Sequence, residues 1–439
     1  MQQAIPSYLS KRADLERWPL HAANTDGIDT VVVIPCLAER DSLRATLASL
    51  AKNSSEQLQH TLVICVVNNR SPQHATVEDV EDNQALLRDL RDLLEGHDNE
   101  TISRDSVEGL RIAFIDASSP GNELSSKDGV GLARKIGLDW AVSLLESSLG
   151  RVRLMCCLDA DTTVEPNYID AVREAFAHET AWAGVIHFEH ALPENPEHRD
   201  AIIDYETFLR CHVHGLRDAG SPYAFHTVGS TMVCTPEAYV AVSGMNRRQA
   251  AEDFYFLQQL AKTGEVQPIA TTTVYPAARP SHRVPFGTGR RISQVLNDSE
   301  DRTTIYNPGS YKFVKECLSI ASSDAETLND VFPHPALHDH PLHTFLRNQN
   351  FDSAWSRIRT SSNTIEQCIR QFHTWFDAFR TLKLIHFLRD DKCPNVDGVG
   401  AARVWTPSEG LGYEEQEQFL MWLREQDREA ATGPPMGLG

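Results

Sequence analysis

Short apolar runs alternate with amphipathic stretches along the N-terminal part of the chain. Between the runs, apolar residues recur at helical spacing over residues 41–51 and 128–149, and Pro166 suits the first turn of a further helix. Strands that alternate with helices predict an α/β fold, in which a mainly parallel sheet carries helices on both faces. Pro35 is expected to end the first run. The apolar runs, typical of strands covered on both faces, are 30–34, 61–67, 110–115 and 152–158.

Two stretches depart from this alternation. The segment 74–95 has an apolar stripe on an otherwise acidic helix, and we interpret it as an addition packed on the sheet edge; binding of a partner is the alternative. After about residue 291 the pattern becomes helical, with an aromatic stripe of Trp375, Phe376 and Phe379 that we expect to pack on the α/β domain. The predicted parts are an N-terminal segment (1–29), an α/β domain (30–291), a mainly helical region (292–429) and a disordered tail (430–439).

Composition narrows the classes of function. The 439 residues include 61 acidic and 41 basic ones, and the net charge of −20 argues against binding to nucleic acid or to an anionic membrane surface. No apolar stretch is long enough for a transmembrane helix, and the N-terminus lacks the apolar core of a signal peptide. Several of the nine cysteines lie in the predicted buried strands, which favours a reducing compartment. We therefore expect a cytoplasmic protein without an integral membrane segment.

Candidate chemistry follows the predicted strands, because ligands of open parallel sheets bind outside the carboxyl ends of the strands. Asp159 and Asp161, one residue apart, can both turn toward one hard cation such as Mg²⁺ or Mn²⁺. An Asx turn or a helix cap is the structural alternative. Neither the glycine-rich fingerprint of dinucleotide sites nor a P-loop is present. The stretches after the four strands are 35–39, 68–71, 116–122 and 159–161.

Further polar residues lie near the starts of predicted helices. Arg134 is near the start of the helix 128–149, where it is either a surface residue or a contact for a diphosphate or a nucleobase. Glu252 and Asp253 open a later helix, so that they either stabilise its N-terminus or supply a carboxylate base at the edge of a pocket.

Taken in order, these segments resemble the family 2 glycosyltransferases over roughly residues 30–291. The resemblance implies the GT-A nucleotide-sugar-binding fold, a mixed and mainly parallel sheet with flanking helices, here followed by a helical C-terminal extension. The matching segments are 31–39, 66–69, 131–141, 158–162, 229–230, 244–246 and 252–257.

The resemblance implies an inverting transfer of a sugar from a nucleotide-diphosphate sugar to an acceptor hydroxyl of unknown identity. Asp159 and Asp161 correspond to the metal and diphosphate motif, with Mn²⁺ or Mg²⁺ as the cofactor, and Arg134 faces the nucleotide. Asp253 corresponds to the catalytic base, and Glu252 is left for orientation or for the acceptor. The positions that border the nucleotide sugar are Pro35, Cys36, Leu37, Glu39, Asn68, Asn69 and Ala160, and those on the acceptor side are Gly229 and Ser230.

The chain departs from the family pattern at several points. Pro72 and Gln73 stand where relatives often have Thr-Asp, and the Q-x-x-R-W segment of processive synthases is not evident, so that a single transfer per encounter is expected. His282 is a candidate third metal ligand, with a structural or solvated loop residue as the alternative. The histidines between His334 and His343 lack a fixed ligand spacing and are expected to be structural.

Two other functions stay open. A sugar nucleotidyltransferase is built on a related sheet, but it normally has a glycine-rich basic loop after the first strand, and residues 35–39 contain no glycine. A catalytically silent nucleotide-sugar-binding protein is the other alternative, against which the presence of Asp159, Asp161 and Asp253 together argues.

Overall fold

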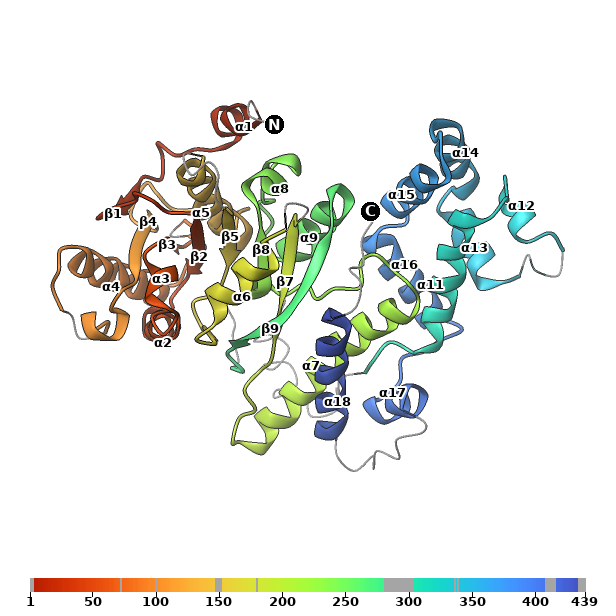
Figure 1. The fold of residues 1–439 in the computed structure, drawn as a ribbon. Coiled ribbons are helices and arrows are strands. Elements are labelled where there is room, and N and C mark those ends of the chain that lie inside the picture. Colours follow the sequence, from red (N-terminus) through yellow and green to blue (C-terminus); the bar gives the residue numbers. More distant parts are fainter. Residues whose placement is uncertain are drawn as a thin grey trace. The chain divides into compact units, whose positions relative to one another are not determined.

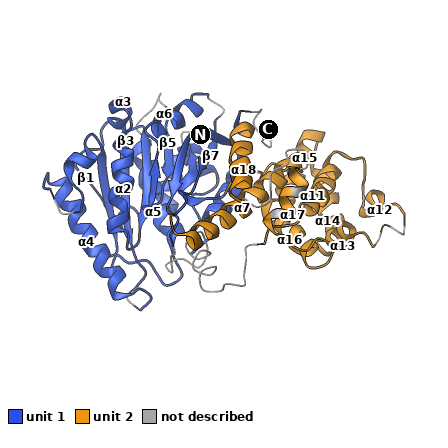
Figure 2. Cartoon of the chain, turned by 90° about the horizontal axis from the view of Figure 1, so that it is seen from below, with its two compact units in different colours: residues 1–193, 227–291, 431–435 blue, residues 194–226, 292–430, 436–439 orange. Residues whose placement is uncertain are grey.

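The chain divides into two compact units in the computed structural model (Figure 2). Unit 1 comprises residues 1–193, 227–291 and 431–435, and unit 2 comprises residues 194–226, 292–430 and 436–439. The division differs from the linear one expected from the sequence, because residues 194–226 belong to unit 2. The described residues are 4–71, 73–98, 101–146, 152–178, 181–279, 304–334, 337, 339–406 and 416–432.

Unit 1 is built around a nine-stranded sheet (Figure 1). Its strands are β1 (Leu20–Ala22), β2 (Thr30–Cys36), β3 (Thr61–Asn68), β4 (Arg111–Ala117), β5 (Leu154–Cys157), β6 (Thr162–Val164), β7 (Ala183–Phe188), β8 (Met232–Cys234) and β9 (Val266–Pro276). Their order is β1-β4-β3-β2-β5-β8-β7-β9-β6. Parallel pairs join β2 to β3, β3 to β4, β2 to β5 and β7 to β9, and the other neighbours are antiparallel. The predicted α/β class with a mixed sheet is confirmed.

The helices of unit 1 flank this sheet. They are α1 (Ala4–Arg12), α2 (Arg40–Leu50), α3 (Ser55–Leu58), α4 (Val77–Leu94), α5 (Val130–Leu145), α6 (Tyr168–Ala175), α8 (Pro236–Ala241) and α9 (Glu252–Thr263). Crossovers between parallel strands are right-handed. The chain steps in one direction from β2 through β3 to β4 and then returns past them to β5, so that α2 and α4 lie on one face of the sheet and α5 lies on the other.

This return of the chain creates a topological switch point between β2 and β5. Ligands of open α/β sheets bind outside the carboxyl ends of the strands at such a point. The residues that follow β2 include Glu39, and those that follow β5 include Asp159 and Asp161. The fold thus brings two of the stretches predicted for ligand binding to the same place.

Pro35 does not end the first long strand, and the expectation that it does is wrong. β2 continues to Cys36, and Pro35 pairs in register with Val66 of β3. β5 pairs with β2 only as far as Val33, so that β2 is paired beyond this residue on the β3 side alone. Proline has no N–H to donate and is tolerated at such an edge position.

The N-terminal segment 1–29 contributes to the fold of unit 1. Tyr8 of α1 donates a hydrogen bond to Asp139 of α5 (2.8 Å), and Tyr239 of α8 donates to the same oxygen (2.8 Å). Lys135 donates to the other carboxylate oxygen of Asp139 (2.5 Å). Because these buried polar groups satisfy one another, they hold α1 on α5 and α8, while β1 adds a strand beside β4.

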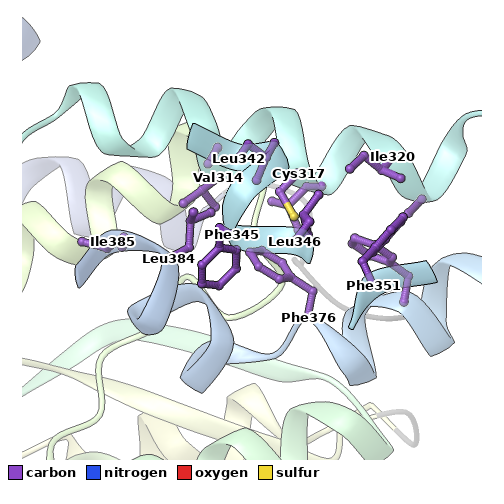
Figure 3. Close-up of a cluster of buried hydrophobic side chains, with 14 of the residues drawn as sticks. Val314, Cys317, Ile320, Leu342, Phe345, Leu346, Phe351, Phe376, Leu384 and Ile385 are labelled. Atoms are coloured by element: carbon purple, nitrogen blue, oxygen red, sulfur yellow. The ribbon is translucent and has the colours of Figure 1, made fainter. Parts of the chain in front are cut away.

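Unit 2 is helical and has a hydrophobic core of its own (Figure 3). Phe376 is fully buried in this core, Trp375 packs against it, and Phe379 is exposed. Trp375 and Phe376 of the aromatic stripe therefore contribute to the core of unit 2. None of the described helices of the chain is long and apolar enough to cross a membrane. The helices of unit 2 are α7 (Pro196–Asp218), α11 (Gly309–Ser319), α12 (Leu328–Val331), α13 (Pro341–Asn348), α14 (Phe351–Ser361), α15 (Ile365–Trp375), α16 (Ala378–Arg389), α17 (Gly398–Trp405) and α18 (Gln416–Ala431).

Two histidines of the segment 334–343 pack on an aromatic ring. The ring centroids of His340 and His343 each lie 5.4 Å from that of Phe332, and His343 is buried. Such ring contacts agree with the structural role expected for His340 and His343. At the other end of unit 2, α18 extends into the predicted tail as far as Ala431.

A buried network of charges joins α18 to α7 within unit 2. Asp427 of α18 accepts hydrogen bonds from Arg210, from Arg217 (2.9 Å) and from His226 (2.8 Å). Burial raises the pKa of the Asp427 carboxyl, but His226 and the two arginines outweigh burial and hold that pKa below its usual value. The ionised carboxylate thus stabilises the attachment of α18.

Replacing Asp427 by Asn should lower the free energy of opening of α18 by about 3 kcal/mol at neutral pH, because the fully buried Arg210 and the partly exposed Arg217 lose a charged partner. Since the folded-state pKa of Asp427 is lowered, its contribution is present above the pKa of the unfolded carboxyl and is lost as the pH falls below about 4. The difference between variant and wild type should therefore narrow in acid. Hydrogen exchange of the α18 amides measures both effects.

Glu425→Gln is the matched control on the same helix, because Glu425 pairs with Arg428 at the surface (3.6 Å). It should change the protection of α18 by less than about 0.5 kcal/mol. Equal protection of α18 in Asp427→Asn and in the wild type at neutral pH would contradict the role given to this network.

Candidate active site

Arg279 links the loops that follow β2 and β5. Its guanidinium donates to Glu39 after β2 (2.5 Å) and to Asp161 after β5 (3.0 and 3.2 Å). The pairing of β9 with β6 fixes the arginine here, because the backbone N–H of Ala277, just past β9, donates to the carbonyl of Asp161 (3.1 Å). The ion pairs therefore span the topological switch point of the sheet.

A second arginine joins Asp159 to Glu252. Arg134 lies in the first half of α5 and is 3 % exposed; one Nη atom donates to Asp159 and the other to Glu252 at the start of α9. Burial opposes the charge of the guanidinium, but the two carboxylates outweigh burial and raise the pKa of Arg134. The structure thus brings together three residues that the sequence singles out at distant positions.

Two glycines allow Arg134 to meet the start of α9. A Cβ atom on Gly229 would lie 2.3 Å from Arg134 Nη2, so that only glycine leaves room for the guanidinium. A Cβ atom on Gly131 would lie 2.6 Å from the carbonyl oxygen of Arg248, in the loop that leads to α9. Ser230, predicted with Gly229 on the acceptor side, is fully buried and presents no surface to an acceptor.

Asp253 lies beside Glu252 in a different environment. Its side chain is half-buried, and its Oδ1 accepts a hydrogen bond from the backbone N–H of Phe254 (2.7 Å). Burial and the negative charge of Glu252 raise the pKa of Asp253 to about 7, against the opposing effect of Arg134. A carboxyl group that exchanges its proton near neutral pH is suited to general base catalysis.

Two alanines with left-handed backbone conformation precede the carboxylates of the site. Ala38, before Glu39, has a φ of 52°, and Ala251, before Glu252, has a φ of 57°. This conformation costs a residue with a Cβ atom about 1–2 kcal/mol. Strained residues of this kind cluster at functional sites, and here each turn delivers the following carboxylate toward an arginine.

Carboxylates outnumber cations among the described residues of the site. Burial, together with the charges of Glu39 and Asp159, raises the pKa of Asp161 to about 6 even though Arg279 opposes the shift. Such an excess of negative charge is what a bound divalent cation would offset. The carboxylates are Glu39, Asp159, Asp161, Glu252 and Asp253, and the cations are Arg134 and Arg279.

The residues present fit a Mg²⁺ or Mn²⁺ ion. The side chains of Asp159 and Asp161 are 34 % and 26 % exposed, so that each keeps carboxylate surface for a metal bond besides its contact with an arginine. His282, the predicted third ligand, lies outside the described residues. Within the described part of the chain, three potential ligand atoms lie within 4.8 Å of one another elsewhere, near the C-terminal end of α4, at Asp92, Glu95 and His97.

Asn83 of α4 connects the loops after β2 and β3 by hydrogen bonds. Its Nδ2 donates to the carbonyl of Asn68 and to Asn69 Oδ1 (both 3.0 Å), and its Oδ1 accepts from the backbone N–H of Ala38 (2.9 Å). Asn83 is fully buried, and Asn69 also accepts from Ser118 after β4. The helix interpreted from the sequence as an addition thus supports the edge predicted to border the nucleoside.

The other predicted contacts are mostly inside the fold. Pro35 and Cys36 are buried within β2, and burial raises the pKa of the Cys36 thiol well above its usual value. These two side chains therefore belong to the interior of the sheet rather than to its ligand-binding edge. Ala160 is buried as well, and its carbonyl accepts a hydrogen bond from Thr46 of α2 (2.8 Å). Leu37 is half-buried in the loop that follows β2.

Arg279 and Asn83 are missing from the sequence prediction. Asn83 does carry a local signal, because it stands three residues after Val80 and four before Leu87, on the apolar stripe of the helix. A polar residue on such a stripe is buried and needs partners. Arg279 has no comparable signal, since Asp161 and Glu39 lie 118 and 240 residues away in the chain.

No protein-family model matches the chain, and no curated protein matches it in sequence. Among solved structures, it is similar to TarS 1-349 of S. aureus in complex with UDP-GlcNAc, with 11 % identity, coverage of 80 % of this chain and 92 % of that chain, and a TM-score of 0.37. It is also similar to the mannosyltransferase PcManGT from Pyrobaculum calidifontis in complex with GDP-Man and Mn²⁺, with 12 % identity, coverage of 98 % and 92 %, and a TM-score of 0.36. At these TM-scores the likeness assigns no function to the chain.

Replacing Asn83 by Asp should lower the free energy of unfolding by about 1–3 kcal/mol, because a carboxylate cannot donate to the two oxygens of Asn68 and Asn69. Urea unfolding of the full chain measures the loss. Gln84→Glu is the matched control, since the hydroxyl of Ser119 already donates to Gln84 Oε1 (3.4 Å) and can donate to a carboxylate in the same way. If both variants unfold at the same urea concentration, Asn83 does not have the bracing role described.

Proposed function

We propose that the chain is an inverting, metal-dependent glycosyltransferase of family 2 with the GT-A fold. It would move a sugar from a nucleotide-diphosphate sugar to an acceptor hydroxyl, once per encounter. The observation that carries the proposal is the meeting of Asp159, Asp161 and Glu39 at the topological switch point, beside the start of α9. The sequence resemblance to that family supports it independently, because it assigns metal and base roles to residues that turn out to be neighbours.

Donor binding requires a counter-charge for the diphosphate in a site rich in carboxylates. Asp159 and Asp161 would hold Mn²⁺ or Mg²⁺, and such an ion supplies stabilisation of the charge that develops on the leaving diphosphate. Arg134, whose guanidinium is buried between Asp159 and Glu252, would orient Asp159 and add positive charge behind it rather than contact the nucleotide directly. The Asn68–Asn69 turn, held by Asn83, would border the nucleoside.

Asp253 is the proposed general base. Its carboxylate would take the proton of the acceptor hydroxyl as that oxygen attacks the anomeric carbon from the face opposite the leaving group. This single displacement inverts the anomeric centre. Glu252 is the less suitable base because its carboxylate is bound to Arg134, and we assign it to positioning.

A thermal-shift screen with UDP, GDP, ADP, CDP and dTDP, each with MnCl₂ and with EDTA, tests donor binding, since a ligand of the folded state raises the melting temperature. At least one nucleotide should raise it in Mn²⁺ only. Sugar release from the matching donor, with and without candidate acceptors, then separates a transferase from a silent binding protein. The absence of any shift in Mn²⁺ would contradict the proposal.

Replacing Asp161 by Asn should weaken Mn²⁺-dependent nucleotide binding by about tenfold or more, because the site loses a charged metal ligand. Isothermal titration calorimetry measures the affinity. Asp92→Asn is the control, since Asp92 belongs to the other group of potential ligands on unit 1, and it should leave the affinity unchanged. Equal nucleotide affinity of the wild type in Mn²⁺ and in EDTA would contradict the assignment of Asp159 and Asp161 as metal ligands.

Replacing Asp253 by Asn should lower turnover by about 10²–10⁴-fold and leave donor affinity nearly unchanged, because the amide keeps the size but accepts no proton. Steady-state kinetics with the acceptor found in the screen measure both quantities. In the wild type, turnover should rise as the pH approaches the Asp253 pKa of about 7 from below, because Asp253 then loses its proton. The variant should lack this rise. Near wild-type turnover in Asp253→Asn would exclude Asp253 as the base.

A further inference from the structure

Arg279 sits where it competes with the proposed cation. Its Nη2 atom lies 3.0 Å from Asp161 Oδ2 and 2.5 Å from Glu39 Oε1, so that it neutralises one proposed metal ligand and the carboxylate across the switch point. A divalent ion at Asp161 and a guanidinium on the same carboxylate repel each other. The site therefore holds a positive charge that metal binding has to move.

Hydrogen bonds other than those of Arg279 also hold these loops. The backbone N–H of Ala277 already donates to the carbonyl of Asp161, and the hydroxyl of Thr46 donates to the carbonyl of Ala160. Arg279 is 38 % exposed, in contrast to Arg134, which is buried between its two carboxylates. The Arg279 side chain can thus change partners without opening the fold.

A nucleoside diphosphate offers Arg279 an alternative partner. The planar guanidinium fork matches phosphate oxygens as well as it matches carboxylates. When a divalent cation binds beside Asp161, the carboxylate has a new counter-charge, and the diphosphate that arrives with this cation brings negative charge within reach. The electrostatic balance then favours the phosphate over the carboxylates as the partner of Arg279.

We propose that Arg279 is the exchangeable cation of this site. It neutralises Glu39 and Asp161 in the absence of the donor, and it passes to the diphosphate when a divalent cation takes its place beside Asp161. This inference rests on the proposed function, because it requires that the site binds a metal ion and a nucleotide diphosphate. Arg279 is thus a donor-binding residue whose partner changes during the binding step.

The exchange predicts effects of opposite sign on two ligands. Removing the charge in Arg279→Gln should strengthen binding of Mn²⁺ alone by about tenfold, because a repelling charge is gone from the ligand set. The same change should weaken binding of pyrophosphate in saturating Mn²⁺ by about tenfold, because a charge-assisted hydrogen bond to phosphate is lost. Arg279→Lys should keep the wild-type Mn²⁺ affinity, since it keeps the charge, and should bind pyrophosphate less tightly than the wild type.

Isothermal titration calorimetry of the full chain, first with MnCl₂ alone and then with pyrophosphate, UDP and GDP in saturating Mn²⁺, measures both affinities without any need for turnover. Arg247→Gln is the matched control. Arg247 pairs with Asp128 (3.0 Å) and is 58 % exposed, so that the same change is made at an ion pair outside the ligand set. This control should alter neither affinity.

Each outcome decides between distinct roles of Arg279. Tighter Mn²⁺ and weaker pyrophosphate in Arg279→Gln support the exchange. If both affinities fall, the arginine holds local structure only; if both rise, it only repels cations; if neither changes, it has no part in binding; any of these overturns the proposal. Failure of the wild type to bind any nucleotide diphosphate in Mn²⁺ would instead contradict the proposed function itself.

Discussion

Carboxylates crowd the carboxyl ends of β2 and β5, and their mutual repulsion constrains much of unit 1. Burial is the larger cause, and this repulsion the second, of the raised pKa values of about 6 at Asp161 and about 7 at Asp253. Arg134 of α5 and Arg279, which follows β9, relieve part of it. The close approach at Gly229 follows from the same need, because a buried guanidinium has to fit between its partners. The remaining negative charge suits the site to a divalent cation and a diphosphate rather than to a diphosphate alone.

The helix α5 shows how one element meets several of these demands at once. Arg134 faces the site, the next residue Lys135 pairs with Asp139 toward α1 and α8, and Gly137 packs against Val33 of β2. Successive residues of a helix point about 100° apart, so that these contacts use separate faces. The position of Arg134 therefore depends on the packing of α5 on the sheet and on the docking of the N-terminal helix. Residues far from the site thus contribute to its geometry.

The sequence predicts the strands β2 to β5 and the helix α5 well, because each is a continuous segment with a strong apolar period. It also predicts the two aspartates after β5, since ligands of such sheets bind where strands end. Arg279 escapes prediction because its place depends on the pairing of β9 with β6, which no local pattern reveals. The sequence does not predict that residues 194–226 belong to unit 2 for a similar reason, because Arg210 is paired with Asp427, 217 residues further along the chain. Local periodicity therefore predicts individual helices and strands, and pairing between residues distant in sequence determines which side chains meet at the site.

The most direct test of the account is the anomalous scattering of manganese in crystals grown with Mn²⁺ and a nucleoside diphosphate. We expect a strong anomalous peak about 2.0–2.6 Å from carboxylate oxygens of Asp159 and Asp161, with the diphosphate beside it at the switch point. A peak at the surface group of Asp92, Glu95 and His97, with the nucleotide bound and no manganese at the two aspartates, would contradict the central claim.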